Sequence, residues 1–222
     1  MNNDGHRQRL REKYLKGGIE GFLDYEILEL FLIYASARKD CKAKSKELIE
    51  KFGSLEGVFN APKEKLLEIE DMGNASYILI KLFKDIQKYI YKEDKLRGRK
   101  ISSTKELIEY LNYDMANLQV EVFKIIFLDT QNVFINEKTI VVGTIDKSYI
   151  YPRELLKEIF EHNAKSVIFA HNHPSGNLNP SKADINFTNS MRSLLKELEI
   201  NLLDHVIIGT SGHYSFLEEN LL

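Results

Sequence analysis

Over the first ninety or so residues, apolar positions recur at the three- and four-residue spacing of amphipathic helices. One such segment follows Asp24, which is predicted to cap the helix, and it carries a broad apolar face made of Ile27, Leu28, Leu30, Phe31 and Tyr34. Further helices are predicted for Lys44 to Phe52, from Pro62 and from Asn74, each with a suitable starting or ending residue. The pattern predicts a small helical bundle with short connections over residues 1–95.

The helical periodicity stops between Lys92 and Ser102, where mixed charges surround a glycine, and we interpret this stretch as a linker. A helix is expected to begin at Ser103 or Thr104. Gln119 to Leu128 then forms a β-rich run that is apolar on both faces, and Asp129 to Asn132 predicts a hairpin turn. The strands that follow the turn are expected at Val133 to Ile135 and Thr139 to Ile145.

The rest of the chain alternates between the two periodicities. Pro152 fits the first position of a helix that ends near His162, and Ser166 to Ala170 predicts a buried strand. A second helix is predicted from about Ser181 to Glu199, and two closing strands follow at Leu202 to Ile208 and Tyr214 to Leu217. This order predicts an α/β domain over residues 102–222, with helices flanking a central mixed sheet.

Composition and charge narrow the class of protein. The chain has 222 residues with 43% hydrophobic content, and its formal net charge of -2 shows no basic excess of the kind that binds nucleic acid. The single cysteine, Cys41, excludes an internal disulfide and a multi-cysteine zinc site. No apolar run approaches the roughly 20 residues that cross a bilayer, so we expect a cytoplasmic protein without membrane contact. The oligomeric state stays open.

The stretch from His171 to Asp184 holds the strongest chemical signal. His171 and His173 are two residues apart, so in an extended segment both project to the same side. Two imidazoles and the Asp184 carboxylate are usual ligands of a catalytic zinc. Ser181 and Asp184 also have the spacing of a helix capping box, which gives Ser181 a purely structural alternative. Ser181 and Asp184 can form the capping box while Asp184 also binds the metal, if the first turn of the helix faces the histidine loop.

These residues resemble a known family. His171-x-His173-Pro174 followed by Ser181-x-x-Asp184 resembles the JAMM (MPN+) metalloprotease signature, and the full run HNHPSGNLNPSKAD resembles the RadC family of bacterial proteins. Three other segments agree with the resemblance, which covers most of the chain: Tyr151 to Glu154, Asn163 to Ala164 and Leu203 to His205.

The resemblance implies an MPN/JAB-like, cytidine-deaminase-like α/β domain that holds one zinc ion per chain on His171, His173 and Asp184. It implies that Ser181 hydrogen-bonds the attacking water or stabilises an oxyanion. The function that it implies is a JAMM-type zinc hydrolase, which cleaves a peptide or isopeptide bond in a protein or peptide substrate. The sequence does not identify that substrate.

A zinc hydrolase also needs a proton acceptor, and the carboxylates upstream of the histidines are Glu121, Glu137, Glu154, Glu158 and Glu161. In the predicted strand, Glu121 shares a face with Phe123 and Ile125, where burial would raise its pKa toward the range useful for a base. A carboxylate that reaches solvent at the strand end is the alternative. Glu154 is already explained by its place in the first turn of a helix. The resemblance also places the catalytic base at Glu121.

A second class of function comes from the helical half. Leu66 to Ala75 resembles a helix-hairpin-helix, which binds a DNA phosphate with backbone amides, so a DNA-associated repair or recombination factor is the alternative. Asp71 and Ser76 depart from the family pattern at the turn, and the Asp71 carboxylate would repel a phosphate. A possible basic stripe follows, made of Lys81, Lys84 and Lys88, although such lysines more often form a solvated face. A third alternative is a scaffold without activity.

Two further histidines have simpler interpretations. His6 is expected in a disordered terminal tail. His205 follows Asp204 at the head of an apolar strand, where it could orient a metal ligand, but a core histidine with its hydrogen bonds satisfied is the favoured interpretation.

Overall fold

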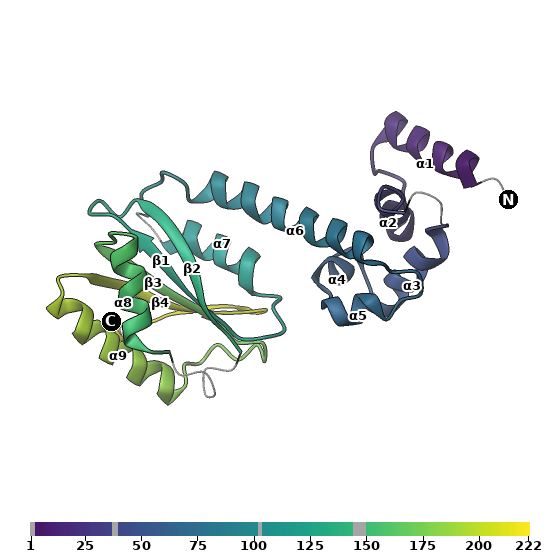
Figure 1. The fold of residues 1–222 in the computed structure, drawn as a ribbon. Coiled ribbons are helices and arrows are strands. Elements are labelled where there is room, and N and C mark those ends of the chain that lie inside the picture. Colours follow the sequence, from purple (N-terminus) through teal and green to yellow (C-terminus); the bar gives the residue numbers. More distant parts are fainter. Residues whose placement is uncertain (1–2, 37–39, 102–103, 144–149) are drawn as a thin grey trace. The chain divides into compact units, whose positions relative to one another are not determined.

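The structure is a computed structural model, and it describes residues 3–36, 40–101, 104–143 and 150–222. Ser103 and the predicted strand end at Thr144 and Ile145 lie outside these residues. The contacts between Cα atoms divide the chain into two compact units, Met1–Gln87 and Lys88–Leu222 (Figure 1). Within the described ranges, no helix has both the length and the apolar composition needed to cross a membrane.

The first unit is built from short helices, as the periodicity predicts. In order these are α1 (Asn3–Gly17), α2 (Asp24–Leu32), α3 (Lys42–Phe52), α4 (Leu55–Asn60), α5 (Lys63–Leu67) and the start of α6 (Asn74–Lys95). Their apolar faces meet in one core around Leu28, Leu48 and Ile80. The prediction of a disordered tail around His6 is wrong, because His6 lies within α1 and its Nε2 is 2.8 Å from Glu29 Oε1.

Local sequence signals explain where several of these helices begin and end. Gly53 ends α3 with a left-handed backbone, φ 81°, which glycine adopts without steric cost. Ser54 then caps α4, because its hydroxyl oxygen accepts a hydrogen bond from the Gly57 N–H. Asp24 behaves differently from the prediction, since it is the first residue of α2 and Leu23 occupies the capping position.

The second unit is built on a mixed five-stranded sheet in the order β2-β1-β3-β4-β5. The strands are β1 (Val122–Leu128), β2 (Phe134–Val142), β3 (Ser166–Asn172), β4 (Asn201–Gly209) and β5 (Gly212–Ser215). Only the β3–β4 pair is parallel, and the other neighbours run antiparallel. The predicted hairpin after β1 is confirmed, because Asp129 accepts hydrogen bonds from the Gln131 and Val133 N–H groups and closes the turn.

Helices cover both faces of this sheet (Figure 1). On one face, Leu107 and Leu111 of α7 (Thr104–Met115) pack against Ile126, Ile168 and Val206. The other face is covered by α8 (Pro152–Glu161) and α9 (Lys182–Glu197), whose inner residues pack on the alternate strand positions Phe123, Ile125 and Phe169. Because successive strand residues point to opposite faces, β1, β2, β3 and β4 each contribute side chains to both cores. The α/β class with a central mixed sheet is therefore confirmed.

A buried network of charges lies beneath α7. Lys124 of β1 is 4% exposed and forms ion pairs with Asp114 and with Glu137, whose Oε1 lies 3.4 Å from Lys124 Nζ. Glu137 also accepts a hydrogen bond of 2.6 Å from the Tyr110 hydroxyl. Lys88, near the end of α6, completes the network through Asp114.

This network explains where the chain divides. The predicted domains, 1–95 and 102–222, assign the whole of α6 to the first half, whereas the contacts place residues 88–95 with the second unit. Lys88 and Lys92 are tied there through ion pairs with Asp114 and Glu137.

Candidate metal centre

The two histidines lie where β3 ends. His171 is fully buried in β3 and stands opposite Phe123 of β1. His173 follows the strand by one residue and is held in line with it, because its N–H donates to the Ile208 carbonyl of β4 at 2.8 Å. The extended backbone therefore turns both imidazoles to the same side, as their spacing predicts.

The N-terminus of α9 brings a carboxylate to the same place. The Ser181 hydroxyl oxygen accepts a hydrogen bond of 3.1 Å from the Asp184 N–H, and Asp184 Oδ2 accepts one of 2.7 Å from the Ser181 N–H. This is the predicted capping box. The box fixes the Asp184 side chain through Oδ2, so that Oδ1 lies 3.6 Å from His171 Nε2. Asp184 is 4% exposed.

Three predicted ligands thus converge. His171 Nε2 and His173 Nε2 are 3.0 Å apart, and His173 Nε2 is 3.9 Å from Asp184 Oδ2. A tetrahedral zinc with bonds of about 2.0–2.1 Å separates its donor nitrogens by about 3.3 Å, so the observed spacing is close to what such an ion requires.

The protonation of His171 follows from a chain of buried hydrogen bonds. The Thr188 hydroxyl has one proton and donates it to the Asp184 carbonyl, which can only accept, at 2.6 Å. His205 Nδ1, also 2.6 Å from that hydroxyl, must then carry a proton and donate it to Thr188. This leaves His205 Nε2 as an acceptor for the His171 Nδ1–H at 2.8 Å. His171 Nε2 therefore presents a lone pair.

His173 reaches the same state by a shorter route. Its Nδ1 lies 2.6 Å from the Asn177 carbonyl, which can only accept, so Nδ1 carries the proton and Nε2 presents a lone pair. Two lone pairs then face each other across 3.0 Å beside the Asp184 carboxylate. Such a pair repels unless a cation lies between its members, and neutral imidazole nitrogen with carboxylate oxygen is a donor set that suits zinc. The residues fit the metal.

Burial keeps these histidines neutral. Removal from water lowers the pKa of His171 to about 4, although the nearby Asp184 carboxylate acts in the opposite direction. Burial also lowers the pKa of His205 well below its usual value, and the neighbouring imidazoles of His171 and His173 add to the effect. A neutral imidazole is the form that binds a metal.

Glu121 joins this group from the position just before β1. Because β1 begins at Val122 and the Glu121 side chain is half-buried, the prediction that Glu121 is buried inside the strand is wrong, whereas the face that it was predicted to share with Phe123 is retained. Glu121 is two residues before Phe123, the partner of His171, and so it faces the same side as the histidines. One carboxylate oxygen of Glu121 and one nitrogen each of His171 and His173 lie within 4.8 Å of one another. These three residues form a possible metal site.

The other glutamates considered as bases are engaged elsewhere. Glu137 belongs to the buried network around Lys124, and Glu158 pairs with Lys138 at 3.1 Å. Glu154 and Glu161 make exposed ion pairs on α8 with Arg153 and Lys157. Among the described acids, Glu121 and Asp184 are the two that lie beside the histidines.

Asn172 is a site residue that sequence reasoning missed. Its side chain is buried, and Oδ1 accepts a hydrogen bond of 2.8 Å from the Val122 N–H. Its Nδ2 donates to the Val120 carbonyl at 3.1 Å. The amide therefore holds the backbone on both sides of Glu121 and positions that carboxylate beside the histidines. The Asn residue between two histidines was the available signal, but its partners are about fifty residues away in the chain.

A pocket of about 790 Å³ opens in front of these residues. Glu121, His173 and Ser181 reach it together. The remaining described lining is uncharged and consists of Gln119, Val120, Gly143, Pro174, Ser175, Asn177, Asn179 and Pro180. The site can therefore receive a neutral group next to both carboxylate and imidazole.

The residues considered for DNA contact make their contacts with other residues of this protein. Ser76 is 2% exposed and lies against Ser36, so it does not occupy a phosphate-facing position. The possible basic stripe consists of lysines that all have partners: Lys81 pairs with Asp85, Lys84 donates to Asn60, and Lys88 pairs with Asp114. This arrangement weakens the argument for a basic surface on α6.

The comparisons with known proteins agree on one family. The model of the RadC-like JAB domain matches residues 101–221. A UPF0758 protein of Fusobacterium nucleatum is 43% identical, with 99% of this chain and 98% of the relative aligned. A UPF0758 protein of Ruegeria pomeroyi is 37% identical, with 98% of this chain and 97% of the relative aligned. A UPF0758 protein of Rhodobacter capsulatus is also 37% identical, with 96% of this chain and 100% of the relative aligned.

Proposed function

Because this chain belongs to the family of RadC-like JAB domain proteins, we propose that it is a zinc-dependent hydrolase that cleaves a peptide or isopeptide bond. The observation that carries the proposal is the pair of imidazole lone pairs 3.0 Å apart, with the Asp184 carboxylate 3.6 Å from one of them. The carboxylate and hydroxyl of Glu121 and Ser181 line the same pocket.

We assign His171, His173 and Asp184 as the residues that hold one zinc ion per chain. A bound zinc supplies Lewis acidity, which makes a water molecule nucleophilic near neutral pH. Asp184 is preferred to Glu121 as the third ligand because its side chain is already fixed by the capping box, whereas Glu121 faces the pocket.

Glu121 then acts as the base. Its carboxylate takes a proton from the attacking water as the new carbon–oxygen bond forms, and it returns that proton to the leaving nitrogen as the carbon–nitrogen bond breaks. Ser181 accepts from the Asp184 N–H and keeps its own hydroxyl proton for donation, which can stabilise the negative charge on the substrate oxygen. The uncharged lining of the pocket suits a substrate backbone.

The proposal is tested with zinc-loaded protein incubated with a proteome-derived peptide library and with a panel of lysine-linked isopeptides. Mass spectrometry of new amino termini should detect cleavage by the wild type that falls roughly 100-fold or more in Glu121→Gln. Ser181→Gly, which retains most of the capping stability, should lower the rate without abolishing it. Equal cleavage by wild type and Glu121→Gln, or none by the wild type in either set, would contradict the proposal.

The same preparation tests the alternative of a DNA-associated factor. Binding of duplex DNA that weakens steeply with salt and survives Glu121→Gln would favour that alternative. We expect weak binding, because Lys81, Lys84 and Lys88 are engaged within the protein.

A further inference from the structure

One edge of β4 is only partly covered. β4 pairs with β3 from Asn201 to Ile208, but it pairs with β5 only from Val206 to Gly209. Over the part of the chain that the structure describes, no strand pairs with the other side of the segment from Asn201 to Asp204. The Asn201 N–H donates to the Lys165 carbonyl, so the backbone of Leu202 faces the free edge. A free strand edge can accept a strand from another chain.

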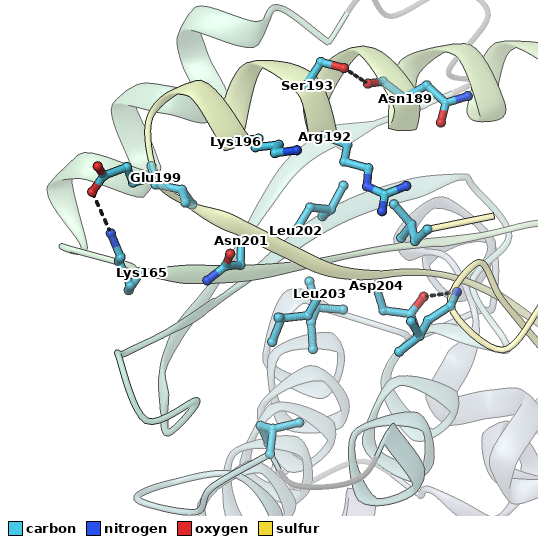
Figure 2. A pocket seen from close by; sticks show the side chains of 15 residues that line it. Lys165, Asn189, Arg192, Ser193, Lys196, Glu199, Asn201, Leu202, Leu203 and Asp204 are labelled. Carbon is cyan, nitrogen blue, oxygen red and sulfur yellow. Dashed lines mark hydrogen bonds and ion pairs between the residues drawn. The ribbon is translucent and has the colours of Figure 1, made fainter. Parts of the chain in front are cut away.

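A pocket of about 1300 Å³ lies along this edge. Figure 2 shows Arg192 and Lys196 extending from α9 on one side of β4, while Leu203 points to the opposite side. Ile101 and Leu217 also line the pocket. The pocket is remote from the metal ligands along the parallel pair, because Asn201 pairs with Ser166 at the start of β3 and His171 lies near its end.

The side chains that line this pocket include three cations, Lys165, Arg192 and Lys196, and two acids, Glu199 and Asp204. Arg192 and Lys196 are exposed, and neither makes an ion pair with another described residue. Lys165 is already paired with Glu199 at 3.6 Å. Asp204 does not neutralise the two free cations, because it is buried and accepts hydrogen bonds from Ser215 Oγ and from backbone N–H groups. The pocket therefore attracts carboxylates.

The lining also offers apolar surface. Leu203 is half-buried and packs against the core beneath α7, and Leu217 is 48% exposed. A small inorganic anion would leave this surface unused. An extended peptide matches all three features, since its backbone can pair with the strand edge and its side chains alternate between the two sides of β4.

We propose that the free edge of β4 from Asn201 to Asp204 is a docking site for an extended acidic peptide segment of a partner protein. About four residues of the segment would add to the sheet, spanning about 13 Å. Its carboxylates face Arg192 and Lys196, and its apolar side chains face Leu203 and Leu217. The site is independent of the metal centre and of its proposed reaction.

The test is fluorescence anisotropy with labelled peptides that alternate glutamate and valine, using full-length Glu121→Gln protein so that the probe is not cleaved. Arg192→Glu/Lys196→Glu in that background should weaken binding roughly tenfold or more. Arg153→Glu/Lys157→Glu, which makes the same charge change on α8, is the matched control and should bind like the parent.

Two further probes separate charge from strand pairing. A peptide with glutamine in place of glutamate should lose most of its affinity, as should one with alternate backbone nitrogens methylated, because methylation removes the donors that pair with a strand. Equal affinity for the two double variants, no binding up to about 1 mM, or undiminished binding of the methylated peptide would overturn the proposal.

Discussion

His205 Nε2 lies 2.8 Å from His171 Nδ1, and this contact determines which nitrogen of His171 faces the proposed metal. The Thr188 hydroxyl fixes the tautomer of His205 in turn. Thr188→Val keeps the shape of the side chain but removes the acceptor for His205 Nδ1–H. We expect the zinc dissociation constant to rise roughly 10- to 100-fold, the usual effect of losing a partner that orients a ligand.

Thr188→Ser is the control for this change, because it retains the hydroxyl. Competition with a chelator of known affinity at pH 7.5 measures the zinc dissociation constant of both variants. Wild-type affinity in Thr188→Val would show that the hydrogen-bond chain does not orient His171.

Asn172→Ala tests how Glu121 is positioned. The substitution leaves the buried Val122 N–H and Val120 carbonyl without their side-chain partner. We expect a loss of about 1–3 kcal/mol of unfolding free energy in urea and a fall in hydrolytic rate, whereas bound zinc is retained. The exposed asparagine Asn186, changed to alanine on α9, is the control. Loss of zinc from Asn172→Ala would show that Asn172 positions the metal ligands rather than Glu121.

The metal-free protein should lose stability as the pH falls below about 6.5. The pKa of His171 is lowered to about 4 by burial, so between these values the unfolded chain binds a proton that the folded chain excludes. Proton binding to the unfolded state reduces the free energy of unfolding. We expect a loss of roughly 1 to 2 kcal/mol from this group between pH 7 and pH 5.

Urea unfolding in the presence of a chelator at both pH values measures this loss. His171→Gln should reduce the pH dependence, with a remainder from His205, whose pKa is also lowered by burial, and His213→Gln, which changes a histidine outside the site, should retain it. Identical pH profiles for wild type and His171→Gln would show that His171 does not contribute.

The buried network beneath α7 should be sensitive to the loss of one partner. Asp114→Ala removes one of the two carboxylates that pair with Lys124, which is 4% exposed and would keep only Glu137 at 3.4 Å. We expect a loss of about 3 kcal/mol of unfolding free energy. Asp85→Ala breaks the exposed Lys81–Asp85 pair and should cost about 0.5 kcal/mol or less. Similar losses for both variants would contradict the buried character of the network.

Much of the second unit could be predicted from local signals. Pro152 marked the start of α8, Ser181 and Asp184 marked the start of α9, and two histidines at the end of an apolar run marked the site. These features depend on residues within a few positions of one another, so the local pattern determines them.

The contacts that complete the site connect distant parts of the chain. His205 reaches His171 across 34 positions, and Asn172 reaches Val122 across 50, so each depends on which strands become neighbours. Glu121 was chosen on the argument that it lies buried inside a strand, but β1 begins at Val122, three residues after the predicted start at Gln119. Strand ends are set by pairing partners, which local sequence does not contain.

Zinc content per chain tests the central assignment most directly, measured by elemental analysis of protein loaded with zinc and freed of excess metal. The account predicts about one zinc in the wild type and in Glu121→Gln, and almost none in Asp184→Asn or in His171→Ala/His173→Ala. A wild type that binds no zinc would contradict the account. So would a full complement of zinc in Asp184→Asn together with its loss in Glu121→Gln, because Glu121 would then be the ligand.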